Sequence, residues 1–249
     1  MRKPEIAWLL ERPIAHRGLH DGNVKIPENS LSAFNRALLA GYPIELDLHL
    51  LADGEVLVFH DRNLSRLCGL DRQVTTMTKD SIRSCRLLQT SERPPLIEEV
   101  FDLVRGAVPL LIELKSTSAP GLLEPRLYEK LRRYGGQYAV QSFNPFHMHW
   151  FARHAPAVAR GQLAGNRITD RISRLQWPAL SNNWNDPHFV GYRAAGLPSR
   201  RVAAQRRKGL PVLAWTVRSQ EECAQLKRYC DNIVFECFTP EEAIAGTAF

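Results

Sequence analysis

The sequence predicts an α/β protein folded as a (β/α)8 barrel, the TIM-barrel architecture. Short apolar runs alternate with amphipathic segments along nearly the whole chain, and a helix between two strands supplies the crossover that parallel strands need. The length of 249 residues suits one barrel, and no linker rich in Gly, Ser or Pro divides it. We therefore expect a single domain over residues 1–249.

Each element is justified by its periodicity and by the residues that begin or end it. In chain order the expected elements are a strand at 14–16, a helix at 31–40, strands at 44–50 and 56–59, a helix at 96–104, a strand at 110–114, a helix at 122–134, a strand at 138–142, a helix at 146–154, a strand at 157–163, a helix at 167–175, a strand at 179–183, a helix at 200–208, a strand at 212–217, a helix at 221–229, a strand at 232–235 and a helix at 240–245. In the first helix Leu31, Phe34 and Leu38 recur at helical spacing. The turn Asp53-Gly54 separates two of the strands.

The segment 61–95 does not fit a simple strand–helix unit. It is long, polar and poorly periodic. We interpret it as an insertion between a strand and the next helix, where barrel loops shape the mouth of an active site.

Composition excludes several classes of protein. Apolar residues make up 44% of the chain, as in soluble globular proteins, and no window approaches the roughly 18 apolar residues that span a bilayer. The N-terminal apolar run at 6–10 is closed by Glu11 and Arg12, too early for a signal peptide. Five cysteines without a C-x-x-C pair argue against zinc or a disulfide framework. We expect a cytoplasmic protein with reduced thiols and no stable membrane insertion.

The charge balance raises the question of an anionic partner. Lys and Arg number 33 against 26 Asp and Glu, a net charge of +7. This suits a nucleic-acid binder, a membrane-surface protein or an enzyme of anionic substrates. The basic clusters at 132–133, 200–201 and 206–208 lack interleaved aromatic residues, so we interpret them as solvated helix faces. We expect a small anionic substrate and no nucleic acid.

The strand at 44–50 places acidic residues inside an apolar run. Residues two apart share a face of a strand, so Glu45, Asp47 and His49 point one way. Buried carboxylates are costly unless compensated, and a hard divalent cation such as Mg²⁺ or Ca²⁺ takes oxygen ligands. The alternative is an edge strand with a solvated acidic face.

The strand at 110–114 gives a matching signal. Glu113 and Lys115 lie two apart near its C-terminal end, where the active sites of barrels lie. Glu113 with Glu45 and Asp47 could hold one cation. Lys115 could be a point charge for a phosphate, or the partner of a neighbouring carboxylate.

Two histidines close strands on the same predicted rim. His16 is followed by Arg17 and Gly18, and His60 ends the strand at 56–59. A single such histidine is more often structural, but two beside carboxylates suggest a general acid and a general base. Arg17 could grip phosphate oxygens with two parallel hydrogen bonds, and Gly18 would let the backbone approach a ligand.

These motifs together resemble one enzyme family. They are HRG at 16–18, PENS at 27–30, ELDLHLLADGEVLVFHD at 45–61, IELK at 112–115, QSFNP at 141–145 and WTV at 215–217. In this order they resemble the glycerophosphodiester phosphodiesterases of the bacterial cytoplasmic type, over residues 12–245. The resemblance implies a barrel of the phospholipase C-like phosphodiesterase type, with the insertion at 61–95.

The resemblance also implies a reaction and its residues. The reaction is metal-dependent hydrolysis of a glycerophosphodiester to glycerol 3-phosphate and an alcohol, in lipid and glycerol metabolism. The implied residues are His16 and His60 as general acid and base, Arg17, Lys115 and Trp215 for the substrate, and Glu45, Asp47 and Glu113 for Mg²⁺ or Ca²⁺. The resemblance leaves open which histidine is the acid and what the nucleophile is. It also leaves open the head group, the native metal and the oligomeric state.

Two further stretches, at 28–30 and 235–237, lie within or near these motifs. Asn29 or Ser30 is expected to cap the first helix, and Glu28 to be architectural, although it could still reach the site. The last strand departs from the family's pattern of a Thr-Asp or similar small polar pair, since Phe235, Glu236 and Cys237 stand there. Glu236 could still point into the barrel mouth.

The same barrel could carry other functions. One is a lysophospholipase D-like or other phosphodiesterase, which would need an apolar entrance that the polar segment 61–95 does not favour. Another is a phosphodiester-binding homologue without catalysis, which the intact histidines and carboxylates disfavour. A nucleic-acid phosphodiesterase is disfavoured by the resemblance.

Overall fold

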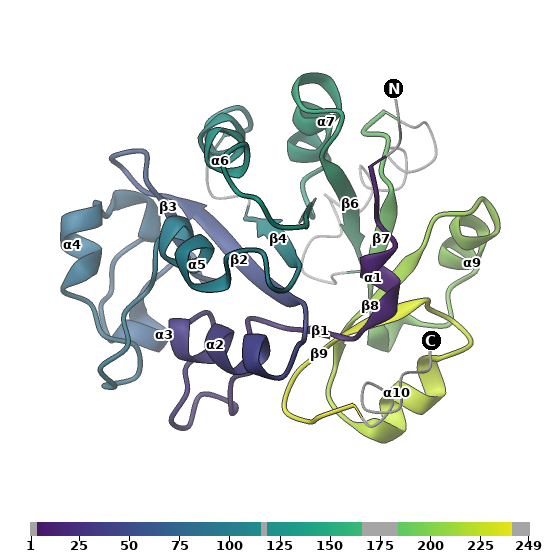
Figure 1. Cartoon of the computed structure of the whole chain (residues 1–249), viewed down its shortest axis with the longest axis horizontal. Helices are drawn as coiled ribbons and strands as arrows, with labels where there is room; N and C mark the ends of the chain where they lie inside the picture. Colours follow the sequence, from purple (N-terminus) through teal and green to yellow (C-terminus); the bar gives the residue numbers. More distant parts are fainter. Residues whose placement is uncertain (1–3, 116–118, 166–183, 241–249) are drawn as a thin grey trace. The chain divides into compact units, whose positions relative to one another are not determined.

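The computed structural model describes residues 4–115, 119–165 and 184–240. The chain divides into two compact units, one of residues 17–137 and one of residues 1–16 with 138–249. In each unit strands alternate with helices along the chain (Figure 1).

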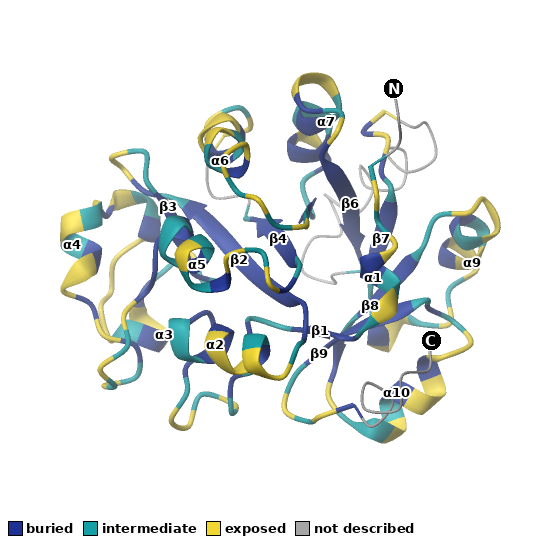
Figure 2. Ribbon diagram, viewed as in Figure 1, coloured by how far each residue is buried: buried dark blue, intermediate teal, exposed yellow. Residues whose placement is uncertain are grey.

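The unit of residues 17–137 is built on the strands β2, β3 and β4. Its elements are α2 (Leu31–Leu39), β2 (Ile44–Leu50), β3 (Val56–Val58), α3 (Ser65–Cys68), η1 (Val74–Thr76), α4 (Lys79–Arg83), α5 (Ile97–Val104), β4 (Leu110–Leu114) and α6 (Leu123–Leu131). β2 pairs with β4 in parallel and with β3 in antiparallel fashion. Every residue of β4 is buried, as are those of β2 up to His49 (Figure 2).

The antiparallel pairing of β3 with β2 follows from the tight turn between them. The alternation of elements predicts parallel strands, but β2 and β3 follow each other without a helix. The chain turns back at once, because the backbone N–H of Gly54 donates to the carbonyl of Leu51 and that of Leu51 donates to Glu55. Such a tight connection permits only antiparallel strands, since a parallel pair needs a crossover.

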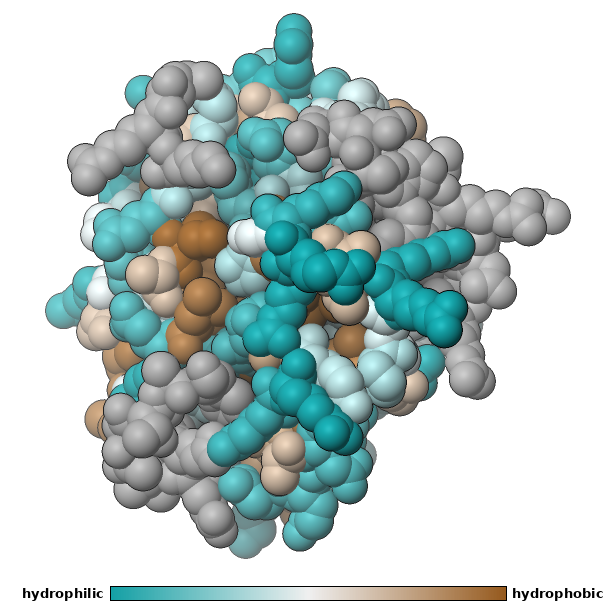
Figure 3. Space-filling model, turned by 90° about the vertical axis from the view of Figure 1, so that its right-hand side faces the viewer, coloured by the Kyte–Doolittle hydropathy of each residue, from teal (hydrophilic) through white to brown (hydrophobic). Residues whose placement is uncertain are grey.

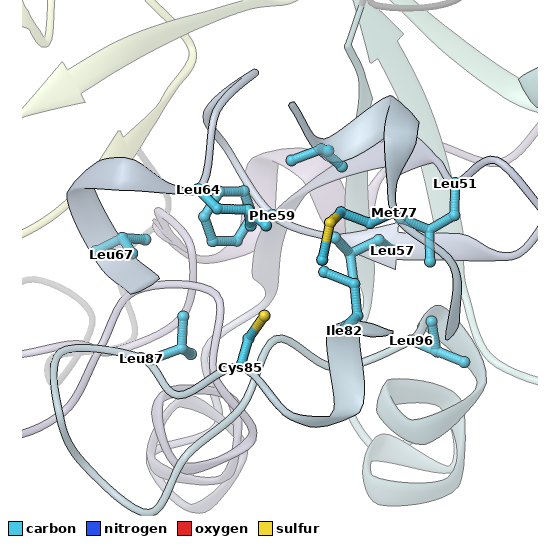
Figure 4. Packing of buried hydrophobic residues seen from close by; sticks show 11 residues of the cluster. Leu51, Leu57, Phe59, Leu64, Leu67, Met77, Ile82, Cys85, Leu87 and Leu96 are labelled. Carbon is cyan, nitrogen blue, oxygen red and sulfur yellow. The ribbon is translucent and has the colours of Figure 1, made fainter. Parts of the chain in front are cut away.

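The segment 61–95 contains more structure than its sequence indicates. It carries α3, η1 and α4, and seven of its apolar side chains pack with four from its flanks into one cluster (Figure 4). The cluster consists of Leu51, Leu57, Phe59, Leu64, Leu67, Val74, Met77, Ile82, Cys85, Leu87 and Leu96. Apolar residues here are spaced irregularly because short helices and turns, rather than one long helix, present them to the core.

The other unit contains a parallel sheet with the strand order β1-β9-β8-β7-β6-β5. Its elements are α1 (Trp8–Glu11), β1 (Ile14–Ala15), β5 (Tyr138–Ser142), α7 (Pro145–His154), β6 (Ala159–Ala164), β7 (Phe189–Arg193), η3 (Ala194–Gly196), α9 (Arg200–Arg207), β8 (Val212–Val217), α10 (Gln220–Leu226) and β9 (Asn232–Phe235). Asn232 of β9 anchors α1, because its Nδ2 donates hydrogen bonds to the carbonyls of Leu9 and Arg12, each at 2.7 Å.

Strand β7 was not predicted. The strand expected at 179–183 and the helix expected at 167–175 lie outside the described residues, as does the helix at 240–245 beyond residue 240. β7 contains Gly191 within a short run, which weakens its apolar pattern. The glycine has a packing role, since a Cβ there would come within 2.4 Å of Leu163 on β6.

Part of the predicted basic clusters lies on the surface of helix α9. In helix α9 the side chains of Arg200, Arg201 and Arg207 are exposed. Figure 3 shows hydrophilic side chains beside hydrophobic patches on the face at the right of Figure 1. Within the described ranges, no helix is long and apolar enough to cross a membrane.

Candidate active site

Three carboxylates gather on neighbouring strands of the unit 17–137. Parallel pairing sets Asp47 of β2 opposite Glu113 of β4, and Glu45 lies on the same face of β2, two residues earlier. One oxygen of each carboxylate lies within 4.8 Å of those of the other two, and all three residues are buried. This is the grouping that strand periodicity predicted, whereas the role of the carboxylates as metal ligands stays a prediction. The alternative of a solvated acidic edge is wrong, because β2 lies between β4 and β3.

The electrostatics of this cluster fit a cation. Burial, together with the nearby charges of Asp47 and Glu113, raises the pKa of Glu45 well above its usual value. Burial also raises the pKa of Glu113, against the lowering effect of Lys115. Carboxylates that repel one another in a buried site are stabilised by a divalent ion, and an all-oxygen donor set suits Mg²⁺ or Ca²⁺.

Two basic side chains partly balance the cluster. Lys115 Nζ donates to Oε1 of Glu113 at 2.6 Å and lies 2.8 Å from Oδ1 of Asp47. Arg17 Nε lies 3.1 Å from Oδ2 of Asp47, and its backbone N–H donates to Glu45 at 3.1 Å. Burial opposes the charge of both cations, but the carboxylates outweigh it and raise the pKa of Arg17 and of Lys115. Both side chains therefore stay charged.

A tight loop brings Arg17 to this position. Arg17 and Gly18 both adopt positive φ, at 55° and 77°. A Cβ at Gly18 would lie 2.8 Å from the backbone carbon of Ala33 at the start of α2. Only glycine combines that conformation with that close approach, so Gly18 lets the loop press against the helix while Arg17 faces the carboxylates.

Asn29 is a site residue that the sequence interpretation missed. Ser30, not Asn29, caps α2, since its hydroxyl accepts from the N–H of Ala33 at 3.2 Å. Asn29 Nδ2 instead donates to Oδ2 of Asp47 at 2.9 Å, and the backbone N–H of Asn29 donates to the carbonyl of Arg17 at 3.0 Å. In the sequence, the position of Asn29 in the PENS motif was the signal for a role at the site. A preference for asparagine at helix caps explains that position equally well.

Glu28 also lies at the site rather than in the architecture alone. Its Oε1 accepts from Arg17 Nη1 at 2.6 Å, and the residue is buried. The guanidinium of Arg17 is therefore held by Glu28 on one side and by Asp47 on the other.

His60 belongs to the same unit and is held at two points. Its Nδ1 donates to Oδ1 of Asp61 at 2.7 Å, which sets the proton on Nδ1 in the neutral ring and makes Nε2 the basic nitrogen. The carbonyl of His60 accepts from His49 Nε2 at 3.1 Å. Burial lowers the pKa of His49 to about 4, so this ring is neutral near pH 7 and supports the backbone of His60.

His16 and Trp215 belong to the other unit. His16 follows β1, its backbone N–H donates to the carbonyl of Phe235 at 2.9 Å, and its Nδ1 is hydrogen-bonded to Glu236. Arg218 lies 2.7 Å from the second oxygen of Glu236. Trp215 on β8 meets Phe143 edge to face, with 5.3 Å between ring centroids. The atypical last strand thus supplies a carboxylate to His16.

The comparisons with known proteins bear on the family and the fold. Residues 16–235 match the model of the glycerophosphoryl diester phosphodiesterase family. A glycerophosphodiester phosphodiesterase of Bacillus altitudinis is 34% identical, over 92% of this chain and 95% of that protein. One from Caldanaerobacter subterraneus subsp. tengcongensis is 32% identical, over 89% and 92%. An Oleispira antarctica phosphodiesterase in complex with its product sn-glycerol-3-phosphate superposes with a TM-score of 0.79 at 23% identity, covering 96% of this chain and 97% of that one.

The chain belongs to the glycerophosphoryl diester phosphodiesterase family. The predicted family, the (β/α)8 barrel fold and the enzyme class, a phosphoric diester hydrolase, are confirmed.

Proposed function

We propose that this protein hydrolyses glycerophosphodiesters to glycerol 3-phosphate and an alcohol, in a reaction that depends on a divalent cation and uses His16 and His60 as general acid and base. The observation that supports this most strongly is a buried group of three carboxylates flanked by two basic side chains. The carboxylates are Glu45, Asp47 and Glu113, and the basic side chains are Arg17 and Lys115. Acidic ligands beside basic phosphate-binding groups are the pairing that metal-assisted phosphodiester hydrolysis requires.

The three carboxylates would hold the cation, Mg²⁺ or Ca²⁺. When bound, such an ion supplies positive charge that stabilises the charge developing on phosphoryl oxygens. The raised pKa of Glu45 and Glu113 supports this role, because a bound cation would stabilise the charged form of crowded, buried carboxylates.

Arg17 and Lys115 would bind the phosphate oxygens. Both are charged and half-buried beside the carboxylates, so they present positive charge where a phosphate would meet the cation site. Trp215 would form a wall for the glycerol moiety, with the edge-to-face contact of Phe143 fixing its ring.

Each histidine would transfer protons through Nε2. Carboxylates hold Nδ1 of both rings, Glu236 in the case of His16 and Asp61 in the case of His60. A carboxylate in this position orients the ring. One histidine activates the nucleophile, and the other protonates the departing alcohol, a contribution of about 10²–10⁴-fold each.

A coupled assay for glycerol 3-phosphate tests the proposal. Glycerophosphocholine and glycerophosphoethanolamine are offered to protein stripped with EDTA and reloaded with Mg²⁺, Ca²⁺ or Mn²⁺ in turn. We expect release only with added cation, and a loss of at least about 10²-fold in kcat for His16→Ala and His60→Ala. Metal-replete wild type that releases no glycerol 3-phosphate from any diester would refute the proposal.

The segment 61–95 bears on the size of the substrate. Seven of its apolar side chains are buried in the cluster that it shares with its flanks, so these seven do not supply an entrance for an acyl chain. Lysophosphatidylcholine is therefore expected to be a poorer substrate than glycerophosphocholine. The reverse preference would favour the lysophospholipase D-like alternative.

A further inference from the structure

Arg66 on α3 binds two carboxylates at once. Its Nη2 donates to Glu28 Oε1 at 2.6 Å and its Nη1 to Glu28 Oε2 at 3.1 Å. Its Nε donates to Asp61 Oδ2 at 2.7 Å, and its Nη2 also reaches Asp61 Oδ1 at 3.1 Å. Both edges of the planar guanidinium are thus occupied by two-point contacts.

Each of these carboxylates holds a group that the proposed function uses. Glu28 accepts from Arg17 Nη1 at 2.6 Å, through the same oxygen that meets Arg66. Asp61 accepts from His60 Nδ1 at 2.7 Å, again through an oxygen that Arg66 reaches. The order of contacts is therefore His60, Asp61, Arg66, Glu28 and Arg17, without a gap.

Glu28, Asp61 and Arg66 all stay charged near neutral pH. Burial acts to raise the pKa of Glu28, but Arg66 and Arg17 lower it to about 2. Burial likewise opposes the charge of Asp61, while His60 and Arg66 hold its pKa well below the usual range. The two carboxylates raise the pKa of Arg66. The contacts are charge-assisted and correspondingly directional.

We propose that Arg66 is a positioning residue, which holds the phosphate-binding Arg17 and the proton-transferring His60 in one arrangement through Glu28 and Asp61. The inference rests on the proposed function of Arg17 and His60. It gives the segment 61–95 a role beyond shaping the mouth, since α3 of that segment fixes two groups of the site.

The geometry requires arginine. A lysine ammonium is a point charge that meets one carboxylate oxygen well, whereas the guanidinium presents donors along two edges. Arg66→Lys should therefore keep charge balance but hold only one of the two carboxylates in place.

The test compares Arg66→Ala and Arg66→Lys with Arg93→Ala. Arg93 is a matched control from the same segment, because its side chain is 47% exposed against 45% for Arg66 and it pairs with one glutamate, Glu99, at 2.7 Å. Circular dichroism and thermal unfolding establish that each variant is folded before kinetics are measured on glycerophosphocholine.

We expect Arg66→Ala to lower kcat and raise KM together, with kcat/KM falling about 10²-fold, since a small misplacement of reacting groups costs that much. Arg66→Lys should recover part of this loss. Guanidinium ion at concentrations far below denaturing should restore activity to Arg66→Ala and leave Arg93→Ala unchanged. In an Arg17→Ala background, Arg66→Ala should raise KM little further, because its effect on KM passes through Arg17.

A folded Arg66→Ala variant with wild-type kcat and KM would overturn the inference. So would an activity loss that only follows the fraction of unfolded protein, with no response to guanidinium. Calorimetric titration with sn-glycerol 3-phosphate distinguishes failure of the inference about Arg66 from failure of the proposed function. Wild type without turnover refutes the function, whereas binding that is equally tight in wild type and Arg66→Ala refutes the role of Arg66.

Discussion

Glu236 is the residue through which the unusual end of β9 acts. Its carboxylate hydrogen-bonds His16 Nδ1, although 220 residues separate the two along the chain. A carboxylate there orients the imidazole and stabilises its charged form. The end of β9 therefore provides an acidic partner for the histidine.

Replacing Glu236 by Gln removes the charge while keeping the shape. We expect kcat to fall by about 10²-fold, with KM nearly unchanged, because the effect passes through the proton-transferring ring. Steady-state kinetics on glycerophosphocholine measure this. Glu221→Gln, at an exposed position of α10, is the control. Wild-type kcat in Glu236→Gln would show that His16 does not depend on this partner.

Glu28 contributes to stability in a defined pH range. Its pKa is lowered from 4.5 to about 2 in the folded protein, so its contribution is complete above pH 4.5 and is lost as the pH falls toward 2. Urea unfolding between pH 6 and pH 2 should show wild type losing up to about 3 kcal/mol more than Glu28→Gln over that range. Parallel pH profiles for the two proteins would contradict the expectation.

At the scale of elements, β6 and β7 fit together through paired large and small residues. Gly161 lies opposite Phe189 in the sheet, and Leu163 lies opposite Gly191. A Cβ at Gly161 would come within 2.1 Å of the Phe189 ring, so the aromatic side chain occupies the space that the glycine leaves. Close packing between neighbouring strands of this kind has no signature in the local periodicity of either strand.

Gly161→Ala should therefore overpack this contact. We expect the free energy of unfolding to fall by about 1–3 kcal/mol, as measured by urea denaturation. Gly135→Ala is the matched control, because a Cβ there meets no atom within 4 Å. Equal stabilities of the two variants would mean that Phe189 moves aside freely.

The elements show where sequence patterns sufficed. The strands β2, β5, β8 and β9 have the bounds that their apolar runs predict. β7 and the short helices of residues 61–95 did not follow from the sequence, because a glycine-containing run and scattered apolar residues carry little periodic signal. The antiparallel placement of β3 depended on the tightness of its connection to β2.

At the scale of the whole molecule, a cation held by the buried carboxylates would link folding to ion binding. An ion that binds only the folded protein stabilises it by about 2.7 kcal/mol at 100 times its Kd, which raises Tm by several degrees in a chain of this size. We expect Mg²⁺ or Ca²⁺ to raise the Tm of EDTA-stripped protein. Glu45→Gln with Glu113→Gln should abolish the shift, while Asp80→Asn, at an exposed site, should retain it. A shift of equal size in the double variant would place the ion elsewhere.

The net charge of +7 says little about this site. Exposed arginines such as those of α9 account for part of the excess, whereas Arg17 and Lys115 are balanced locally by carboxylates. The absence of a nucleic-acid partner and the cytoplasmic location stay predictions.

The sequence by itself determined the alternation of strands and helices, the common face of Glu45 and Asp47, and the motifs that define the family. These are local properties, since the repeat of a strand or a helix fixes which neighbouring side chains share a face. Only the tertiary structure decided that Asn29 binds Asp47, that Arg66 joins Glu28 to Asp61, and that Glu236 meets His16. Those contacts join positions whose distance in space is set by loop conformations and by long-range strand pairing, which no local pattern of residues records.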